Sequence, residues 1–572
     1  MNLRSLPRLL LMLCCGAGSA HPFSGLAPVL HIIHGPTHQG SYIHRLRQGA
    51  TRMRAIASIV SMLLLFFGLQ AQCPIDSTVI IIQDITVIPM TDTTTVLNHA
   101  SVLIENGLIT QVGDTASVAV PPDALVIDGT GRYLIPGLAD MHAHLLRRDD
   151  ALLLLANGVT TVCNMHGEPW HVTFRDSLLD GDVELHGARI MAPRLYTTGP
   201  IMNFMGHPFF QPPPIQNVQQ AQASLWDQDS IGYDFYKPYT YLTNNVFTLL
   251  QAHAAGSGRF IKGHGNDWVG AMNVITSDQK CIEHFWGYLP NGALDAAEQA
   301  LEDSTIASGK WNCPTLIVRW NKEHLDSIRA NEPAEVAFAC PPFLVANWRN
   351  STQNPQEFAN VAEYLALLKR LHDSGAKLML GTDNVTPYAV AGYAVHRELE
   401  LFVQAGLTPH QALALATAAP NTFLEECGHA PNAGAVAVGR KADLVLLNAD
   451  PLDDISNTRS IHGVFGRGAY YPANCLQDLV ASAACGITTT AGPVHAEEGI
   501  LSIRPNPVND VLHIDDTVLG PDAELLVING TGQVVLRSGR TSGIDVRSLA
   551  RGTYYVLAID EGNTFSSSFI KE

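Results

Sequence analysis

The sequence predicts an α/β protein built on a (β/α)8 barrel of the TIM type, with a small β-sandwich formed by segments that flank the barrel. Three observations support this prediction. Apolar strand-like runs alternate with helix-compatible stretches over residues 136–430. Two β-rich segments, 73–135 and 431–475, lie on either side of that region. A linker at 486–500 precedes a last β-rich segment, 501–572, which we expect to form an all-β domain.

The composition indicates a large globular protein with an acidic body. The chain has 572 residues, of which 46% are apolar and 15% charged, enough to bury a large core. Residues 1–72 contain six arginines and no acidic residue, so the remainder carries all 53 acidic residues and 29 of the 35 basic ones. The resulting net charge of −24 argues against a nucleic-acid partner.

The N-terminal region resembles a leader rather than part of the fold. Residues 53–72 combine a basic start at Arg54, a run of fifteen apolar or small residues and the small residue Ala71, the pattern of a secretory signal peptide. The apolar run is too short to span a bilayer, so we expect no transmembrane segment in the mature chain. We interpret residues 1–52 as an extension preceding the true start at Met53; a disordered leader is the alternative.

The flanking segments are rich in β-branched residues punctuated by Gly and Asp. TVIIIQDITVIPM opens the first segment, and GAVAVGRKADLVLLNADPL, from Gly434 to Leu452, is a matching run in the second. We predict that the two segments pair into one sandwich.

Between them we expect eight barrel strands, each of which ends in polar residues. The runs are LADMHAH, GVTTVCNMH, ARIMAPRLYTTG, YDFYKPY, RFIKGHG, QKCIEHF, CPTLIVRW and KLMLGTD. Helix-compatible stretches such as NNVFTLLQAHAAG separate them, and a long insertion, residues 321–376, precedes the last strand. Active sites of such barrels lie at the carboxyl ends of the strands, where these polar residues fall.

Eight cysteines follow residue 72, without metal-binding spacing, and we interpret most of them as buried apolar residues. One candidate disulfide joins Cys475 and Cys485.

The stretch PGLADMHAHL contains two histidines, His142 and His144, that a strand would place on one face. With 23 histidines in the chain, about one such pair is expected by chance from composition alone. The pair therefore indicates a metal site only if other strands supply partners.

Further candidate ligands follow four other strands. These are Lys237, His264, His284 and Asp383, after strands four, five, six and eight. Each alone has a structural interpretation: a hydrogen-bonded histidine, a salt-bridged lysine or an aspartate that caps a helix. Their joint order favours a catalytic centre for zinc or a related divalent ion.

A lysine becomes a metal-bridging carboxylate if CO2 carbamylates it, and burial among cations favours the loss of its charge. We therefore expect two divalent ions, with zinc as the candidate and the six residues above as ligands, and we expect Lys237 to bind as a carbamate. The chemistry is then hydrolysis by water that the ions activate, with Asp383 carrying the proton from the water to the leaving amine.

Residues 78–475 resemble the amidohydrolase superfamily, in its imidazolonepropionase-like and prolidase-like branch. The motifs are PGLADMHAHL, LLANGVTTVCNM, GYDFYKPY, CIEHF, LMLGTDN, HRELELFVQAGLTPHQALALATAAPN and VGRKADLVLLNADPL. The resemblance implies a metal-dependent barrel with a flanking sandwich and the six ligands named above. The run Asn164-Met165-His166 departs from the acidic and glycine residues common in relatives, which bears on substrate contacts rather than on metal binding.

Residues 501–572 resemble the C-terminal sorting domain of type IX secretion substrates, through PNPVND, GTYYV and Lys571. This implies the type IX machinery as a partner and a secreted or cell-surface location, reached through the periplasm and outer membrane. A small adhesion module is the alternative.

These observations predict a secreted hydrolase of amide bonds in small molecules, dipeptides such as Xaa-Pro or N-acyl amino acids. Arg319, after the seventh predicted strand, is a candidate for binding a substrate carboxylate. His207 and Tyr241 are further candidates for the pocket. A lactone or phosphoester hydrolase, and a surface-displayed binding protein without catalysis, are the alternatives; a homo-oligomer is left open.

Overall fold

The computed structural model describes residues 73–483 and 499–571, apart from the short stretches 180–190, 208, 290–295, 340, 352–359, 501–502, 505–507, 515–518, 521–522, 530–533 and 561–562. The predicted extension, the predicted signal peptide and most of the predicted linker lie outside these residues. No helix among the described residues is long and apolar enough to cross a membrane.

Eight parallel strands form the barrel. They are β6 (Leu138–Ala143), β7 (Val159–Asn164), β8 (Arg194–Thr197), β9 (Phe235–Tyr236), β10 (Phe260–Gly263), β11 (Cys281–Glu283), β12 (Trp311–Cys313) and β13 (Lys377–Leu378). A bridge between Thr198 and Phe235 joins β8 to β9, and the Met141 amide donates to the Leu380 carbonyl at 3.0 Å, which closes the ring. Every residue of β6 and β7 is buried, as expected for strands covered on both faces.

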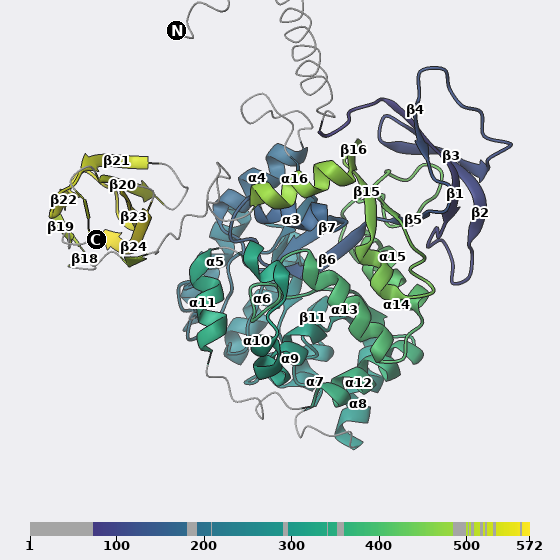
Figure 1. Ribbon diagram of the computed structural model, residues 1–572. Coiled ribbons are helices and arrows are strands. Elements are labelled where there is room, and N and C mark those ends of the chain that lie inside the picture. Colours follow the sequence, from purple (N-terminus) through teal and green to yellow (C-terminus); the bar gives the residue numbers. More distant parts are fainter. Residues whose placement is uncertain are drawn as a thin grey trace, which may run out of the picture. The chain divides into compact units, whose positions relative to one another are not determined.

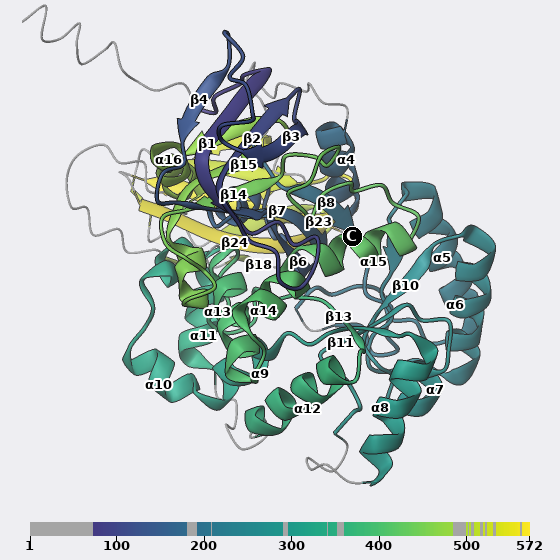
Figure 2. The ribbon, with the colours of Figure 1, turned by 90° about the vertical axis from the view of Figure 1, so that its right-hand side faces the viewer.

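Helices surround these strands, and Figure 2 shows α6, α7, α8 and α12 outside β10, β11 and β13. The helices that follow the first six strands are α3 (Asp150–Ala156), α4 (Pro169–Leu179), α5 (Val218–Ile231), α6 (Asn244–Ser257), α7 (Ala271–Ile275) and α8 (Ala296–Ser308). Local sequence sets their ends: the Thr243 side chain accepts from the Val246 amide at the start of α6, and Gly258 ends it at a φ of 72°.

The long insertion after β12 is helical. It contains α9 (Leu316–Glu323), α10 (Leu325–Ala330), α11 (Pro342–Asn350) and α12 (Val361–Asp373); α13 (Tyr393–Gln404), α14 (Pro409–Ala416) and α15 (Ala418–Glu426) follow β13. One expectation was wrong here. The run LIVRW belongs to α9 rather than to the seventh strand, because the strand ends at Cys313 and the chain turns at Thr315. Arg319 therefore lies on a helix.

The two flanking segments join in one eight-stranded sheet, at the upper right of Figure 1. Its strands are β1 (Val79–Val87), β2 (Leu97–Glu105), β3 (Leu108–Asp114), β4 (Leu125–Asp128), β5 (Tyr133–Pro136), β14 (Leu444–Leu447), β15 (Ile461–Gly466) and β16 (Ala469–Pro472). Antiparallel pairing of β5 with β14 connects the segments, and a separate apolar cluster that includes Ile82, Val102 and Leu446 forms its core.

A disulfide joins Cys73, ahead of β1, to Cys475 in α16 (Ala473–Ala483). Cys475 therefore does not pair with the candidate partner Cys485: the fold brings the Cα atoms of Cys73 and Cys475 to 5.5 Å although 402 residues separate them in the chain.

The C-terminal region, drawn in yellow in Figure 1, is all-β. Two small sheets, in the strand orders β17-β24-β23-β20-β21 and β18-β19-β22, share an apolar cluster that includes Leu512, Val527 and Val556. The strands are β17 (Gly499–Ile500), β18 (Ile503–Arg504), β19 (Val511–Ile514), β20 (Glu524–Asn529), β21 (Val534–Gly539), β22 (Gly543–Asp545), β23 (Gly552–Asp560) and β24 (Asn563–Lys571).

Candidate metal centre and substrate cavity

The six side chains expected as metal ligands converge on one cavity of about 360 Å³ at the carboxyl ends of the barrel strands. They come from different strands, far apart in the sequence, and all six line this cavity: His142, His144, Lys237, His264, His284 and Asp383. Five of the six are buried, and Asp383 is half-buried.

Asp383 lies at the centre of the group. Its Oδ1 is 3.0 Å from the His144 Nε2 and 3.4 Å from the His142 Nε2, and its Oδ2 is 4.0 Å from the His284 Nδ1. One donor atom each from His142, His144 and Asp383 lies within 4.8 Å of the others, close enough to hold one ion.

Two of these residues have a backbone conformation that L-residues rarely adopt. His284 has a φ of 63° and Asp383 a φ of 51°, and each such conformation costs about 1–3 kcal/mol. The turn at His284 follows directly after the end of β11. It lets two consecutive side chains, Glu283 and His284, both reach His142, which an extended strand would not permit.

The sequence did not predict a role in the site for Glu283 and Lys262, which form a fully buried pair. Glu283 Oε2 lies 2.6 Å from the His142 Nδ1, and its Oε1 forms an ion pair with Lys262. Burial alone would raise the pKa of Glu283, but Lys262 and His142 hold it well below its usual range. The carboxylate thus directs the His142 Nε2 toward the cavity. The only signal in the sequence is an acid beside the histidine in CIEHF.

Asp140 was also missed, and it joins the first and last strands of the barrel below the centre. It accepts from the Thr382 hydroxyl at 2.6 Å, from the Thr382 amide at 3.0 Å and from the His142 amide at 3.2 Å. These bonds hold His142 beside the segment that carries Asp383.

Three imidazoles of the centre, those of His144, His264 and His284, are neutral in the ordinary pH range. Burial lowers the pKa of His144 to about 4, and burial with nearby cationic groups holds the pKa values of His264 and His284 well below the usual range. Burial would raise the pKa of Asp383, but the histidines hold it well below. Neutral imidazoles and an ionised carboxylate are the donors that zinc and related divalent ions take, so these residues fit such ions.

Lys237 is a second buried lysine, with different partners from Lys262. Its Nζ is 3.3 Å from the His142 Nε2, and no carboxylate of the described residues lies within ion-pair distance. Burial lowers its pKa to about 8, although Glu283 and Asp383 oppose the shift. Its amine is therefore neutral more often than an ordinary lysine.

Aromatic residues form much of the cavity wall. Phe210 lies against the ring of His144, with 4.7 Å between centroids, and stacks on His166 at 4.5 Å. His207 also lines the cavity, whereas Tyr241 does not belong to the described lining. The tyrosine in the wall is Tyr239.

Arg319 also lines the cavity, from α9. Its guanidinium lies 3.7 Å from the centroid of the Tyr364 ring, and among the described side chains no carboxylate lies within ion-pair distance. Burial lowers its pKa, yet an arginine keeps its charge. The cavity therefore presents a cation to whatever enters it.

Comparison with curated proteins gives partial matches at low identity. A dihydroorotase from Trichlorobacter lovleyi is 39% identical over 75 residues, or 11% of this chain and 17% of that protein. The amidohydrolase tasK of Hapsidospora irregularis is 26% identical over 385 residues, or 61% of this chain and 38% of that protein. The chain thus covers less than half the length of these two relatives. A 5'-deoxyadenosine deaminase from Methanothermobacter thermautotrophicus is 24% identical over 382 residues and is covered to 81%.

Solved structures share the fold of the larger part of the chain. A Xaa-Pro dipeptidase with bound methionine aligns over 69% of this chain and all of its own, at a TM-score of 0.54 and 16% identity. A putative prolidase from Bifidobacterium longum aligns over 72% of this chain and all of its own, at 0.56 and 22%. The bottromycin amidohydrolase aligns over 71% of this chain and 91% of its own, at 0.56 and 24%.

Two family models match separate parts of the sequence. The model of secretion system C-terminal sorting domains matches residues 502–572, so the all-β region is such a domain, and it indicates export to the cell surface or the medium. The amidohydrolase family model matches residues 133–469, more than half of the chain. With its barrel, its prolidase-like structural neighbours and this match, the chain belongs to the amidohydrolase family.

Proposed function

We propose that this protein is an exported, metal-dependent hydrolase that cleaves amide bonds of small molecules. The observation that carries the proposal is the convergence of four imidazoles, a lysine and a carboxylate in one cavity. None of these six groups is needed to close the barrel, and burying them together is costly unless they hold ions.

His142, His144, Lys237, His264, His284 and Asp383 would hold two divalent ions, with zinc as our candidate. When bound, such ions activate a water molecule and polarise the scissile carbonyl. Asp383 then receives the proton of the water on a carboxylate oxygen and transfers it to the nitrogen of the leaving amine. Glu283 holds His142 in the required tautomer.

Lys237 would bind metal as a carbamate. Carbamylation requires a neutral amine, and burial without a carboxylate partner among the described residues supplies one. The carbamate would carry a negative charge and two carboxylate oxygens, donors that would suit divalent ions in this cavity.

We propose dipeptides such as Xaa-Pro, or N-acyl amino acids, as substrates. Support comes from the chemistry of the cavity: the aromatic wall suits an apolar group, and Arg319 suits a carboxylate. The dipeptidase and prolidase named above are similar in fold, and the activities in their names belong to this class. The sorting domain supports a reaction that takes place after export.

The first test is release of free amine from a library of dipeptides and N-acyl amino acids by the purified, zinc- and bicarbonate-loaded protein. Asp383→Asn should lower kcat by about 100- to 10,000-fold, because it removes the group that moves the proton. The exposed Asp373→Asn should leave kcat unchanged.

Other results would redirect the proposal. Absence of amine release from protein that holds two metal ions per chain would favour a lactone or phosphoester as substrate. Absence of both release and bound metal would favour a binding protein without catalysis.

The role of Arg319 has its own test. Arg319→Ala should raise KM about 10- to 100-fold for substrates with a free carboxylate, since it removes a charge-assisted contact. The same substrates with a carboxamide end should show no change. An equal KM for carboxylate substrates in the two proteins would contradict the assignment.

A further inference from the structure

The stretch HRELELFVQ contributes a fully buried carboxyl group, that of Glu398, which the proposed chemistry does not use. It lies on α13 and reaches across to the start of α9. Its Oε1 accepts from the Leu316 amide and its Oε2 from the Ile317 amide, both at 2.7 Å. Both oxygens therefore cap the first turn of a helix that lies 81 and 82 residues earlier in the chain.

The residue that would ordinarily cap α9 is engaged elsewhere. Thr315 is the N-cap residue, but its side chain makes no capping bond. Its Oγ1 instead lies 2.6 Å from the His284 Nδ1. Helices α5, α6 and α14 differ, since Asn217, Thr243 and Thr408 each cap their own helix. Glu398 satisfies the helix amides in place of Thr315, and the Thr315 hydroxyl contacts His284 instead.

The backbone of Thr315 also requires an external constraint. It has φ 47° and ψ 51°, the left-handed region, which is unfavourable for a β-branched residue. Such a conformation persists only where neighbouring groups determine it. The two bonds from Glu398 fix the peptides on its C-terminal side, and the contact with His284 fixes its side chain.

We propose that Glu398 is a positioning residue that holds Thr315 in this conformation and thereby orients the His284 ring at the metal centre. Through the same bonds it sets the first turn of α9, which carries Val318 and Arg319 to the cavity wall. The inference rests on the proposed metal centre in one respect, that His284 is a ligand.

Cobalt binding tests this inference without relying on catalysis. The readouts are the affinity of the full chain for Co²⁺ in competition with a chelator and the visible absorption spectrum of the bound ion. Glu398→Ala should weaken Co²⁺ binding about 10- to 100-fold and change the spectrum, because His284 loses its orientation. Glu398→Gln keeps one acceptor oxygen and should lie between wild type and Glu398→Ala.

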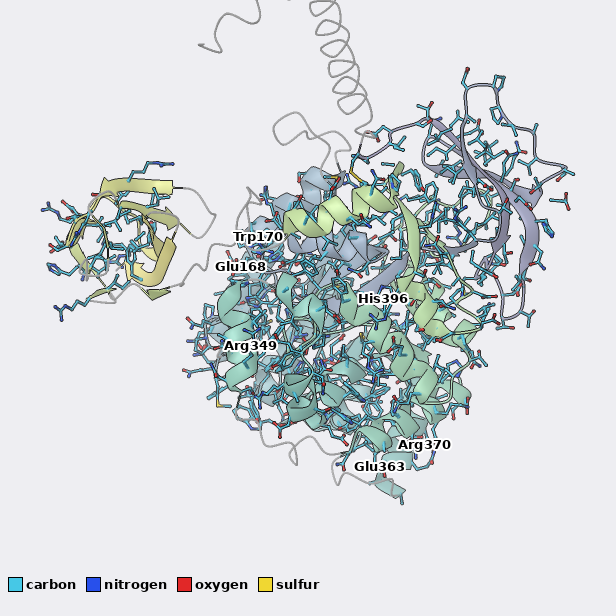
Figure 3. All side chains as sticks on the ribbon, in the orientation of Figure 1. Glu168, Trp170, Arg349, Glu363, Arg370 and His396 are labelled. Carbon is cyan, nitrogen blue, oxygen red and sulfur yellow. A yellow bond between two sulfur atoms is a disulfide. The ribbon has the colours of Figure 1, made fainter. Side chains whose placement is uncertain are left out.

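The matched control is His396, labelled in Figure 3. It is also buried on α13, but its Nδ1 lies 2.9 Å from the Thr458 hydroxyl rather than near α9. His396→Leu should leave the affinity and the spectrum unchanged, even if it lowers the melting temperature.

A double-mutant cycle tests whether Glu398 affects the His284 ring through Thr315 or independently of it. If Glu398 acts through Thr315, the combination of Glu398→Gln with Thr315→Val should weaken Co²⁺ binding no more than Thr315→Val alone. Additive losses would overturn the proposal. These two substitutions carry the test if Glu398→Ala does not fold.

The remaining outcomes are distinct. Wild-type protein that binds no Co²⁺ would overturn the metal centre and this inference together. Wild-type binding with an unchanged affinity and spectrum in Glu398→Ala would overturn only this inference.

Discussion

The two buried lysines near the metal centre show how partners decide the chemistry of a side chain. Lys262 forms an ion pair with Glu283 and remains a cation that neutralises a buried carboxylate. Lys237 has a histidine nitrogen as its nearest polar neighbour, and its pKa is lowered to about 8. Of these two lysines, Lys237 is therefore the one that offers a neutral amine to CO2 near neutral pH.

The lowered pKa predicts how carbamylation depends on pH. The protonated amine does not react, so at a fixed concentration of dissolved CO2 the rate of bicarbonate-dependent activation should rise about tenfold per pH unit below about 8 and level off above it. The measurement is the time course of activation after bicarbonate and zinc are added to metal-free protein. Lys237→Gln should show no such activation, and a rate independent of pH between 6 and 8 would contradict the prediction.

At the scale of elements, the join between β6 and the segment after β13 sets the positions of the candidate ligands of the proposed metal centre. Asp140 and Thr382 bridge the two strands, and Gly381 lets their backbones approach closely. A Cβ on Gly381 would lie 2.4 Å from the Cys313 Sγ and 2.7 Å from the His142 backbone nitrogen. A shift of the backbone of β6 would displace His142, and a shift of the segment after β13 would displace Asp383.

Gly381→Ala should therefore lower the free energy of unfolding by about 1–3 kcal/mol through overpacking and weaken zinc binding. The control is Gly256→Ala in α6, where an added Cβ meets open space and should stabilise by about 0.5–1 kcal/mol. Urea unfolding and zinc titration measure both effects. Unchanged zinc affinity in Gly381→Ala would show that the join does not control the centre.

At the scale of the whole molecule, the Cys73–Cys475 disulfide closes a loop of the chain that contains the barrel and nearly all of the flanking sheet. A disulfide is expected in an oxidising compartment, which agrees with the sorting domain at the C-terminus. The free cysteines of the described residues, Cys163, Cys281, Cys313 and Cys427, are all buried.

Removal of this disulfide should lower the free energy of unfolding by about 2–5 kcal/mol. The cross-link closes a long loop and thereby reduces the conformational entropy of the unfolded chain. The comparison is urea unfolding of Cys475→Ser and of Cys427→Ala, with amide hydrolysis measured in parallel. Cys475→Ser should retain zinc binding and kcat, since the bond lies outside the cavity lining. Equal stability with and without the bond would contradict the prediction.

The sequence by itself determined the barrel, the flanking β-rich segments, the C-terminal β-domain and the polar side chains at the strand ends. This was possible because apolar runs, typical of buried strands, recur along the chain. In addition, the parallel strands of a barrel bring all their carboxyl ends to one face. The order of the residues therefore placed His142, His144, Lys237, His264, His284 and Asp383 near one another.

Only the tertiary structure decided the rest. An alternating strand pattern assigns Glu283 and His284 to opposite faces of the sheet. Both nevertheless reach His142, because the backbone at His284 is left-handed. Arg319 lies on a helix rather than after the predicted strand, because the chain turns at Thr315. Contacts over long sequence separations, Cys73 with Cys475 and Glu398 with α9, leave no periodic trace in the chain, because packing between elements creates them.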